Sequence, residues 1–384
     1  MDFEFLPEER KFKQEVHQFF QSEPELCAGF MEEWHGGEGF GSKTWALLRK
    51  LGEKHWLTPT WPKKYGGLEL PHIYYYIIQE EMSYWIGLYA CVGTAMAGPV
   101  ILQRGTEEQK DFYLPRIASG EIEFCLGYSE PQAGSDLANL QLRAEDKGDY
   151  YLLNGQKMFN TRCHFAQYHW LAARTSSEGP KYRGITLFIV DLKTPGISIT
   201  PLMTFAGERT NDVFYDNVKV PKSALVGEPG MGFYYIMEAL AYERVTPVGA
   251  YQKLFEQLLD YIRESGKGSD PVVRQKIAEL AIELEVCKLF TLNVVSAQSK
   301  GLIPVYEANA AKIFITETEQ RLANTVVNIF GLRGQIQGDS KWNVLNGTFE
   351  FIYRESLMEL IVRGTSEILR NVIAQRGLGL KRRK

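Results

Sequence analysis

The sequence predicts a mostly helical α+β protein with helices at both ends and an antiparallel β domain between them. Three observations predict this order: helical spacing of apolar residues up to residue 118, short β-rich runs after it, and a return to helical spacing beyond Gly230. The expected domains are therefore 1–118, 119–229 and 230–384. Because strands and helices do not alternate, no doubly wound parallel sheet is expected.

The N-terminal domain is predicted to be helical from its first residues. Pro7, followed by two glutamates, suits a first helical turn, where a missing N–H is harmless and acid meets the positive end of the helix dipole. Helical patterns continue over 43–54 and 73–86, and Thr106 is expected to cap a further helix.

Four β-rich segments define the middle domain. The run 150–159 contains Asn154-Gly155 and predicts a hairpin on that turn. Short runs at 185–192, 197–203 and 213–220 are bounded by Gly, Pro, Asn and Asp, which is typical of strands.

The C-terminal domain is predicted to be a helical bundle. Pro271 follows Asp270, which suits a helix start. Apolar residues then recur at helical spacing, and Ile282, Val286 and Leu289 add apolar surface on other sides, so this helix is expected to be buried widely. The alanine-rich segment 306–329 has the same character.

Composition indicates an ordinary globular chain of 384 residues, with 45% hydrophobic and 23% charged residues. A net charge of −4 offers no general attraction for nucleic acid or an anionic membrane. The five cysteines are scattered, so neither a disulfide framework nor a metal site is expected, and a reducing compartment fits best. The short apolar runs and the acidic N-terminal segment predict no membrane insertion and a cytoplasmic location.

Three segments have side chains suited to binding or chemistry. Residues 128–136 form a Gly-, Ser- and Asp-rich turn that can expose N–H groups, although an ordinary turn has the same composition. Residues 154–161 place Phe159 and Thr161 on one strand face, which suits a planar heterocycle, or equally a core Phe beside a surface Thr. Residues 363–370 predict a loop entering a helix, whose free N–H groups favour a ligand oxygen or need only a cap.

The order and spacing of these motifs resemble the acyl-CoA dehydrogenase family over nearly the whole chain. The matching stretches are Trp61-Pro62 with Gly66-Gly67, GTEEQK at 105–110, SEPQAGSD at 129–136, NGQKMFNT at 154–161, VFYDNVKVP at 213–221, YER at 242–244 and RGTSEILR at 363–370. The resemblance implies a C-terminal four-helix bundle, with FAD between it and the β domain. The segment 371–380 resembles a branch that handles bulky, cyclic or carboxylated acyl groups.

The resemblance also assigns residues to FAD. Leu126, Tyr128 and Ser129 are expected beside the flavin, together with Phe159, which stands where the family usually has Trp, and Thr161. The remaining assignments are Thr365 and Glu367 for the adenosine diphosphate and Asn328 and Gly331 for the FAD of a neighbouring subunit. The last assignment implies a homo-oligomer, either a dimer or a tetramer.

The catalytic base is expected to be Glu243. Most family members carry a glutamate immediately before Gly-Thr-Ser, but this chain has Arg363, which stays protonated and cannot act as a base. A minority place the glutamate in a motif that matches 242–244, although an ordinary Glu-Arg surface pair would look the same. Arg363, through its N–H, and Gly364, Arg244 and Ser135 are assigned to the acyl-CoA substrate.

The side chain of Arg363 has three open roles: pairing with Glu243, meeting a distal carboxylate of the substrate, or pointing to solvent. The leading activity is α,β-dehydrogenation of an acyl-CoA with electron-transfer flavoprotein as acceptor. Alternatives are an acyl-CoA oxidase, a flavin monooxygenase, or a catalytically silent subunit of a heteromeric dehydrogenase. The sequence does not identify the acyl group.

Overall fold

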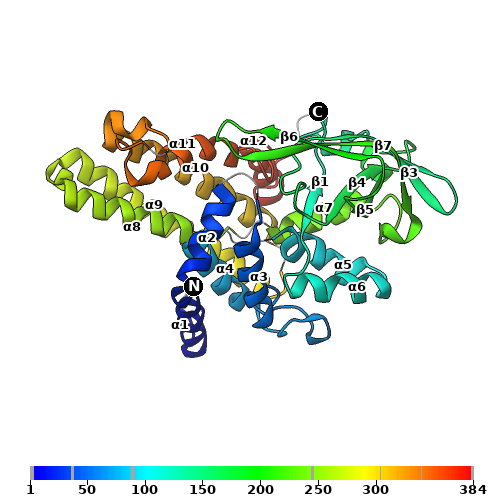
Figure 1. Ribbon diagram of the computed structural model, residues 1–384, viewed down its shortest axis with the longest axis horizontal. Helices are drawn as coiled ribbons and strands as arrows, with labels where there is room; N and C mark the ends of the chain where they lie inside the picture. The colour runs from blue at the N-terminus through cyan, green and yellow to red at the C-terminus, as the bar shows by residue number, and fades with distance from the viewer. Residues whose placement is uncertain are drawn as a thin grey trace. The chain divides into compact units, whose positions relative to one another are not determined.

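The computed structural model describes residues 4–35, 39–87, 91–243, 246–302, 304–338 and 340–381, except for the side chains of residues 34, 35 and 241–243 (Figure 1). The chain folds into two compact units. We call residues 23–71 and 90–243 the β unit, and residues 1–22, 72–89 and 244–384 the bundle unit. This division groups the first and fourth helices with the C-terminal helices, and the three expected domain boundaries stay a prediction.

The β unit is built on one eight-stranded sheet with the order β6-β7-β3-β2-β4-β5-β8, and β1 pairs with β4. The strands are β1 (Phe124–Gly127), β2 (Arg143–Asp146), β3 (Tyr150–Lys157), β4 (Tyr168–Arg174), β5 (Ile185–Asp191), β6 (Ile197–Met203), β7 (Arg209–Pro221) and β8 (Leu225–Val226). The predicted β-rich middle region is confirmed. Its strand pairs are antiparallel except β1–β4 and β2–β4, which are parallel, so the sheet is mixed.

Strand β4 is buried on both faces. Trp170 and Ala172 pack into one cluster with residues of α5 (Gly98–Arg104), α6 (Glu107–Ala118) and α7 (Gly232–Glu243). Leu171 and Ala173, on the opposite face, join a second cluster made by the other strands. This explains why β4 is nearly continuously apolar instead of alternating.

The predicted hairpin on Asn154-Gly155 is wrong. Both residues lie inside β3, which runs on to Lys157 and pairs with β7. The register shifts at this point because Leu153 faces Val218 while Gly155 faces Tyr215, which gives β7 an extra residue. Asn217, on β7, has a left-handed φ of 51° at this point, so β3 and β7 form a β-bulge here. A β-bulge favours the same residue types as a turn.

Other helices of the β unit precede the sheet: α2 (Pro24–His35), α3 (Ser42–Glu53), the short η1 (Lys63–Tyr65) and the π-helical η2 (Gly93–Ala97). Three short helical turns lie between strands: η3 (Leu137–Asn139), η4 (Lys181–Gly184) and η5 (Lys222–Ala224). The predicted cap of α6 is confirmed. The Thr106 hydroxyl accepts from the Gln109 N–H while the Gln109 side chain accepts from the Thr106 N–H, which forms a capping box.

The described helices of the bundle unit are α1 (Pro7–Ser22), α4 (His72–Ile86), α8 (Gly249–Ser265), α9 (Pro271–Ser299), α10 (Val305–Phe330), α11 (Thr348–Glu359) and α12 (Ser366–Val372). Helices α8 and α9 lie alongside each other (Figure 1). Asp270 caps α9 by accepting from the Val272 N–H. The helical bundle and the starts predicted at Pro7 and Pro271 are confirmed.

Wide burial of α9 is wrong. Leu280, Leu284 and Cys287 are buried, but Ile282 is 65% exposed and Leu289 is 45% exposed. The helix packs through one stripe of its surface, and apolar residues outside that stripe stay at the surface of the single chain.

The helices in the described ranges include none that combines the length and the apolar content of a membrane span.

Candidate active site

The first predicted flavin segment lies where β1 leaves the sheet. Leu126 is in β1 and is half-buried, Tyr128 is buried, and Ser129 is half-buried. The N–H of Met158 donates to the Ser129 carbonyl at 2.9 Å, so this segment is tied to the end of β3. Ser135 lies further along the same loop and is exposed.

The second predicted flavin segment, residues 154–161, starts inside β3 and continues beyond its end at Lys157, so the expected placement of Phe159 and Thr161 on one strand face is wrong. Phe159 has a left-handed φ of 59° and a side chain that is 61% exposed. Thr161 is also exposed, and its hydroxyl donates to the Thr210 hydroxyl at 3.2 Å. An exposed aromatic ring and an exposed hydroxyl two residues apart provide the apolar surface and polar group that a planar heterocycle requires, so these residues fit a flavin.

The bundle unit carries the other predicted FAD residues. Asn328, near the end of α10, and the adjoining Gly331 are both exposed. Thr365 caps α12 by accepting from the Ile368 N–H at 3.2 Å, and Glu367 is exposed in its first turn. The loop-to-helix transition predicted here is confirmed.

Arg363 lies in a loop with an uncommon backbone, because it has a φ of 59° and Gly364 a φ of 95°. Its guanidinium donates to the carboxylate of Glu359, one turn earlier in α11. The Arg363 side chain is only 11% exposed, so the solvent-facing role is wrong. Sequence reasoning did not consider Glu359, although the i,i+4 spacing of the two residues is favourable for an ion pair.

A buried polar cluster surrounds this loop. Lys312 is fully buried and donates to the carbonyls of Glu359 at 2.6 Å and Gly364 at 3.3 Å. Glu319 accepts from the Tyr251 hydroxyl at 2.9 Å. Burial, followed by the charge of Glu359, raises the pKa of Glu319 to about 8. Charged residues inside an apolar helix were the only sign of this cluster in the sequence.

The predicted base lies at the end of a helix of the β unit. Glu243 is the last residue of α7, but its side chain is outside the described residues, and so is the whole of Arg244.

Cys125, Cys163 and His169 lie together inside the β unit, with their ligand-type atoms within 4.8 Å of one another. Both ring nitrogens of His169 already have partners, the Tyr215 hydroxyl and the Asn160 amide oxygen. Burial lowers the pKa of His169 to about 3 and raises that of Cys125. We therefore assign this group to the core hydrogen-bond network.

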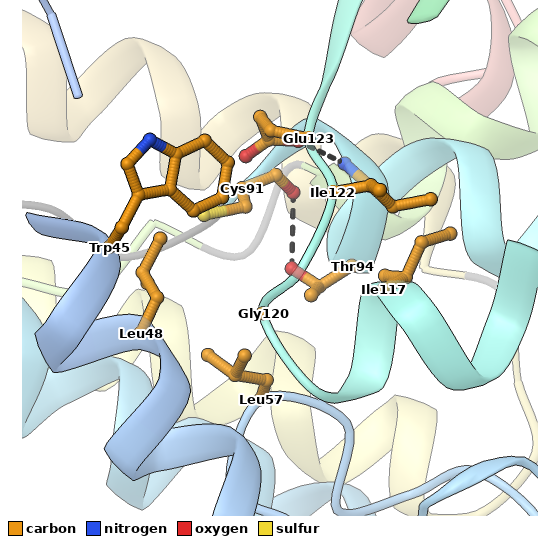
Figure 2. Close-up of a pocket in the computed structure, with 10 residues that line it drawn as sticks. Trp45, Leu48, Leu57, Cys91, Thr94, Ile117, Gly120, Ile122 and Glu123 are labelled. Atoms are coloured by element: carbon orange, nitrogen blue, oxygen red, sulfur yellow. Dashed lines mark hydrogen bonds between the residues drawn. The ribbon is translucent and has the colours of Figure 1, made fainter. Parts of the chain in front are cut away.

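A small pocket of the β unit is lined by none of the predicted site residues (Figure 2). It is lined by Trp45, Leu48, Leu57, Cys91 and Glu123, among others. Glu123 is buried and accepts from the N–H groups of Gly93 and Phe124 at 2.8 and 2.7 Å. We interpret this pocket as a packing feature of the surrounding helices.

Comparison with known proteins identifies the family. Residues 6–121, 125–218 and 230–378 match, in order, the N-terminal, middle and C-terminal domains of acyl-CoA dehydrogenase. The chain therefore belongs to the acyl-CoA dehydrogenase family. It is an FAD-dependent oxidoreductase that acts on the CH–CH bond of an acyl-CoA.

Individual relatives match from end to end. The chain is 32% identical to acyl-CoA dehydrogenase FadE26 of Mycobacterium tuberculosis, with 100% of this chain and 99% of that protein covered. The structure of the Tcur3481-Tcur3483 steroid ACAD has 33% identity and a TM-score of 0.92, with 100% of both chains covered. The ChsE4-ChsE5 complex of Mycobacterium tuberculosis has 31% identity and a TM-score of 0.88, also with 100% of both chains covered.

Proposed function

We propose that this enzyme dehydrogenates the Cα–Cβ bond of a bulky, ring-containing acyl-CoA, with Glu243 as the base. The observation that carries the proposal is the end-to-end likeness to a steroid acyl-CoA dehydrogenase, in a chain whose usual base position is occupied by Arg363.

The base must be a carboxylate that approaches the acidic C–H of the thioester. Arg363 remains a cation at every relevant pH, so the proton must go to another residue. Glu243 lies in the YER motif at 242–244 and at the end of helix α7, which supports its assignment. Bound FAD would supply the acceptor for the hydride that leaves Cβ as the double bond forms.

The loop at Arg363 and Gly364 is assigned to the thioester carbonyl. An N–H donor to that oxygen increases the acidity of the α proton by stabilising the negative charge that develops on it. The two left-handed backbone conformations orient N–H groups differently from a helix, and the contacts of Lys312 and Glu359 hold them in place. Ser135 and Arg244 complete the proposed acyl-CoA site.

The pairing of Arg363 with Glu359 favours an acyl group without a distal carboxylate. A guanidinium that already donates to a carboxylate has less capacity for a second one on the substrate. The alternative of a carboxylated acyl group is therefore the less favoured part of the proposal.

We assign electron-transfer flavoprotein as the acceptor, and a homo-oligomer, either a dimer or a tetramer, as the active form. The cytoplasm is the proposed location, in keeping with five cysteines that form no disulfide in the described parts of the chain, which contain all five.

Glu243→Gln tests the mechanism. The variant should retain FAD yet bleach at least about 1,000-fold more slowly on mixing with a polycyclic acyl-CoA, because the amide cannot accept the α proton. Stopped-flow absorbance of the flavin under anaerobic conditions measures this rate. Glu238→Gln on the same helix, where Glu238 pairs with Arg104 at 3.5 Å, is the matched control. Rapid bleaching of the Glu243→Gln enzyme would reject the assignment.

A second candidate is a silent subunit of a heteromeric dehydrogenase. It is favoured by the likeness of this chain to the ChsE4-ChsE5 complex, which joins two differently named components. Flavin bleaching by the purified chain alone decides between the two functions. An acyl-CoA oxidase or a flavin monooxygenase would instead be identified by rapid reaction of the reduced enzyme with oxygen.

A further inference from the structure

The loop between β1 and β2, residues 128–142, is irregular but closely held. It contains Tyr128 and Ser129 from the first flavin segment, as well as Ser135. Glu130 and Ala133 exchange backbone hydrogen bonds at 3.0 Å, and the loop returns to the sheet through the buried Leu140 and Leu142. A loop of this length needs anchors if its N–H and C=O groups are to keep fixed positions.

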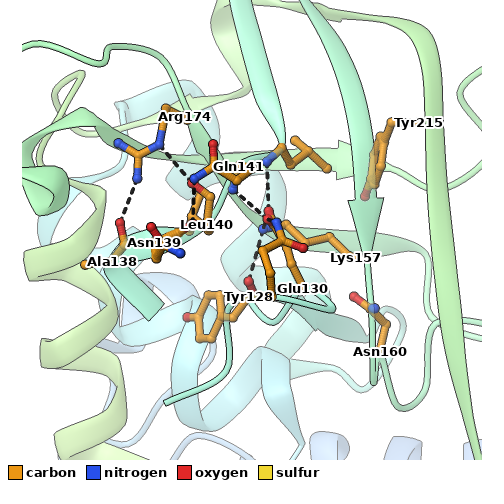
Figure 3. Close-up of polar contacts among 12 residues, drawn as sticks. Tyr128, Glu130, Ala138, Asn139, Leu140, Gln141, Lys157, Asn160, Arg174 and Tyr215 are labelled. Atoms are coloured by element: carbon orange, nitrogen blue, oxygen red, sulfur yellow. Dashed lines mark hydrogen bonds and ion pairs between the residues drawn. The ribbon is translucent and has the colours of Figure 1, made fainter. Parts of the chain in front are cut away.

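Glu130 anchors both ends of the loop (Figure 3). One carboxylate oxygen accepts from the Leu142 N–H at 2.8 Å, and the other accepts from the Gln141 N–H at 2.5 Å and the Gln132 side chain at 2.8 Å. The Lys157 ammonium donates to the first oxygen at 2.8 Å. The side chains of Glu130 and Lys157 are 1% and 0% exposed, so this ion pair is fully removed from water.

Lys157 extends the link to the flavin segments. Its ammonium also donates to the Tyr128 carbonyl at 3.0 Å, and it lies two residues before Phe159. The Met158 N–H donates to the Ser129 carbonyl at 2.9 Å, so consecutive residues at the end of β3 contact consecutive residues of the loop. Phe159 then turns away with a left-handed φ.

Arg174 holds the far part of the same loop. Its guanidinium donates to the carbonyls of Leu140 and Ala138 at 2.8 and 2.7 Å (Figure 3). Glu130, Lys157 and Arg174 therefore come from three different segments and converge on one loop.

A buried ion pair is a poor way to gain stability alone. Removing two charges from water is unfavourable, and well-packed neutral residues often serve the fold equally well. Burial lowers the pKa of Lys157 to about 8 despite the neighbouring carboxylate, which reflects this unfavourable desolvation. What apolar residues cannot supply is a set of directed hydrogen bonds to a carbonyl and to two backbone N–H groups.

We propose that the Glu130–Lys157 pair is a positioning element for the flavin, which fixes Tyr128 and Ser129 relative to Phe159 and Thr161. The inference rests on the proposed assignment of those four residues to FAD. Glu130 and Lys157 are positioning residues that act through the loop. The pair sets the geometry of the flavin surface, and its contribution to folding is secondary.

Two variants and a control separate these roles. Lys157→Met removes the cation and leaves the buried Glu130 carboxyl group without its ion-pair partner, so both the melting temperature and FAD binding should fall. Glu130→Gln/Lys157→Met removes both charges and should recover most of the melting temperature. Lys222→Met, which breaks the exposed Lys222–Asp146 pair of the same unit, is the matched control.

The decisive readouts are the Kd for FAD, from titration of the apoenzyme, and the visible absorption spectrum of bound flavin. We expect the double variant to bind FAD at least about tenfold more weakly than wild type, which is the loss typical when a residue that supports a metal ligand is replaced. Its flavin spectrum should also shift, while Lys222→Met stays unchanged in both.

A double variant that recovers wild-type FAD affinity and spectrum together with its melting temperature would overturn the proposal, because the pair would then be merely structural. This outcome is independent of turnover. A wild-type chain that binds FAD but is not bleached by any acyl-CoA would instead contradict the proposed function.

Discussion

The two units each contain a fully buried lysine, and the two buried ammonium groups have different hydrogen-bond partners. Lys157 in the β unit faces a carboxylate, Glu130, and one loop carbonyl. Lys312 in the bundle unit donates to two carbonyls, those of Glu359 and Gly364. Each lysine therefore fixes a loop that the proposed function assigns to the active site.

The difference lies in what remains when the lysine is removed. In the β unit the opposing charge is a side chain, so a second substitution can neutralise it. In the bundle unit the two carbonyl acceptors of Lys312 are main-chain oxygens, which no substitution removes, and acceptors that lose their donors inside a protein are destabilising. A second substitution should therefore restore stability after loss of Lys157 but not after loss of Lys312.

The largest expected effect follows from Lys312→Met. The variant should lose about 2–4 kcal/mol of stability, because two half-buried carbonyls lose a charged donor and a fully buried side chain is replaced. Thermal unfolding of the holoenzyme measures this loss, and Lys300→Met, at the exposed end of α9, is the control. If the Lys312→Met variant melted at the wild-type temperature, Lys312 would not stabilise its loop in the way proposed for Lys157.

The pH dependence of stability sharpens the comparison. The folded-state pKa of Glu319 is raised to about 8 from an ordinary 4.5, so folded chains keep a proton that unfolded chains lose. The stability from this group is complete below pH 4.5 and is lost as the pH rises through 8. The slope is at most about 1.4 kcal/mol per pH unit.

Glu319→Gln should flatten that slope, as measured by urea unfolding between pH 5 and about 8. Burial raises the pKa of Glu80 to about 7, so Glu80→Gln should independently reduce the slope of stability against pH over a similar range. An unchanged slope in both variants would mean that neither carboxyl stays protonated in the folded chain.

The smallest expected effect concerns a helix end. Thr106→Ala in the capping box of α6 should reduce stability by about 1 kcal/mol, because the Gln109 N–H loses its acceptor. Thr106→Ser keeps the hydroxyl and should stay near wild type in the same thermal unfolding measurement. Equal losses in both variants would assign the effect to the threonine methyl group instead of the cap.

The sequence predicted helix starts and strands well where the local residue pattern is compatible with only one structure. Pro7, Thr106 and Pro271 mark helix starts as expected, and the strand over 197–203 is confirmed with its bounds. Asn154-Gly155 misled because a turn and a β-bulge both favour these residues, and only the pairing partner on β7 distinguishes them. Ile282 misled because helical spacing gives the direction of a side chain but not whether another element covers it.

The candidate site was predicted unevenly for the same reason. The family motifs point to Ser129 and Phe159. The residues that hold them in place do so through contacts between segments that are distant in the sequence. Lys157 shares the strand face of the buried Tyr151 and Leu153, so alternation alone indicates that it is buried. Its partner Glu130 lies 27 positions away and follows no local rule. The sequence likewise contains many possible i,i+4 ion pairs, and nothing in it singles out the pair of Arg363 and Glu359.

Phe159 and Arg363 share a left-handed backbone, a conformation that glycine adopts without strain and that side chains disfavour by about 1–2 kcal/mol. A glycine at either position would relax the chain and at the same time delete the ring or the guanidinium. Selection for stability alone would thus drift toward glycine at both positions. Large side chains there make these two positions sensitive indicators of whether a diverging copy of this enzyme still works.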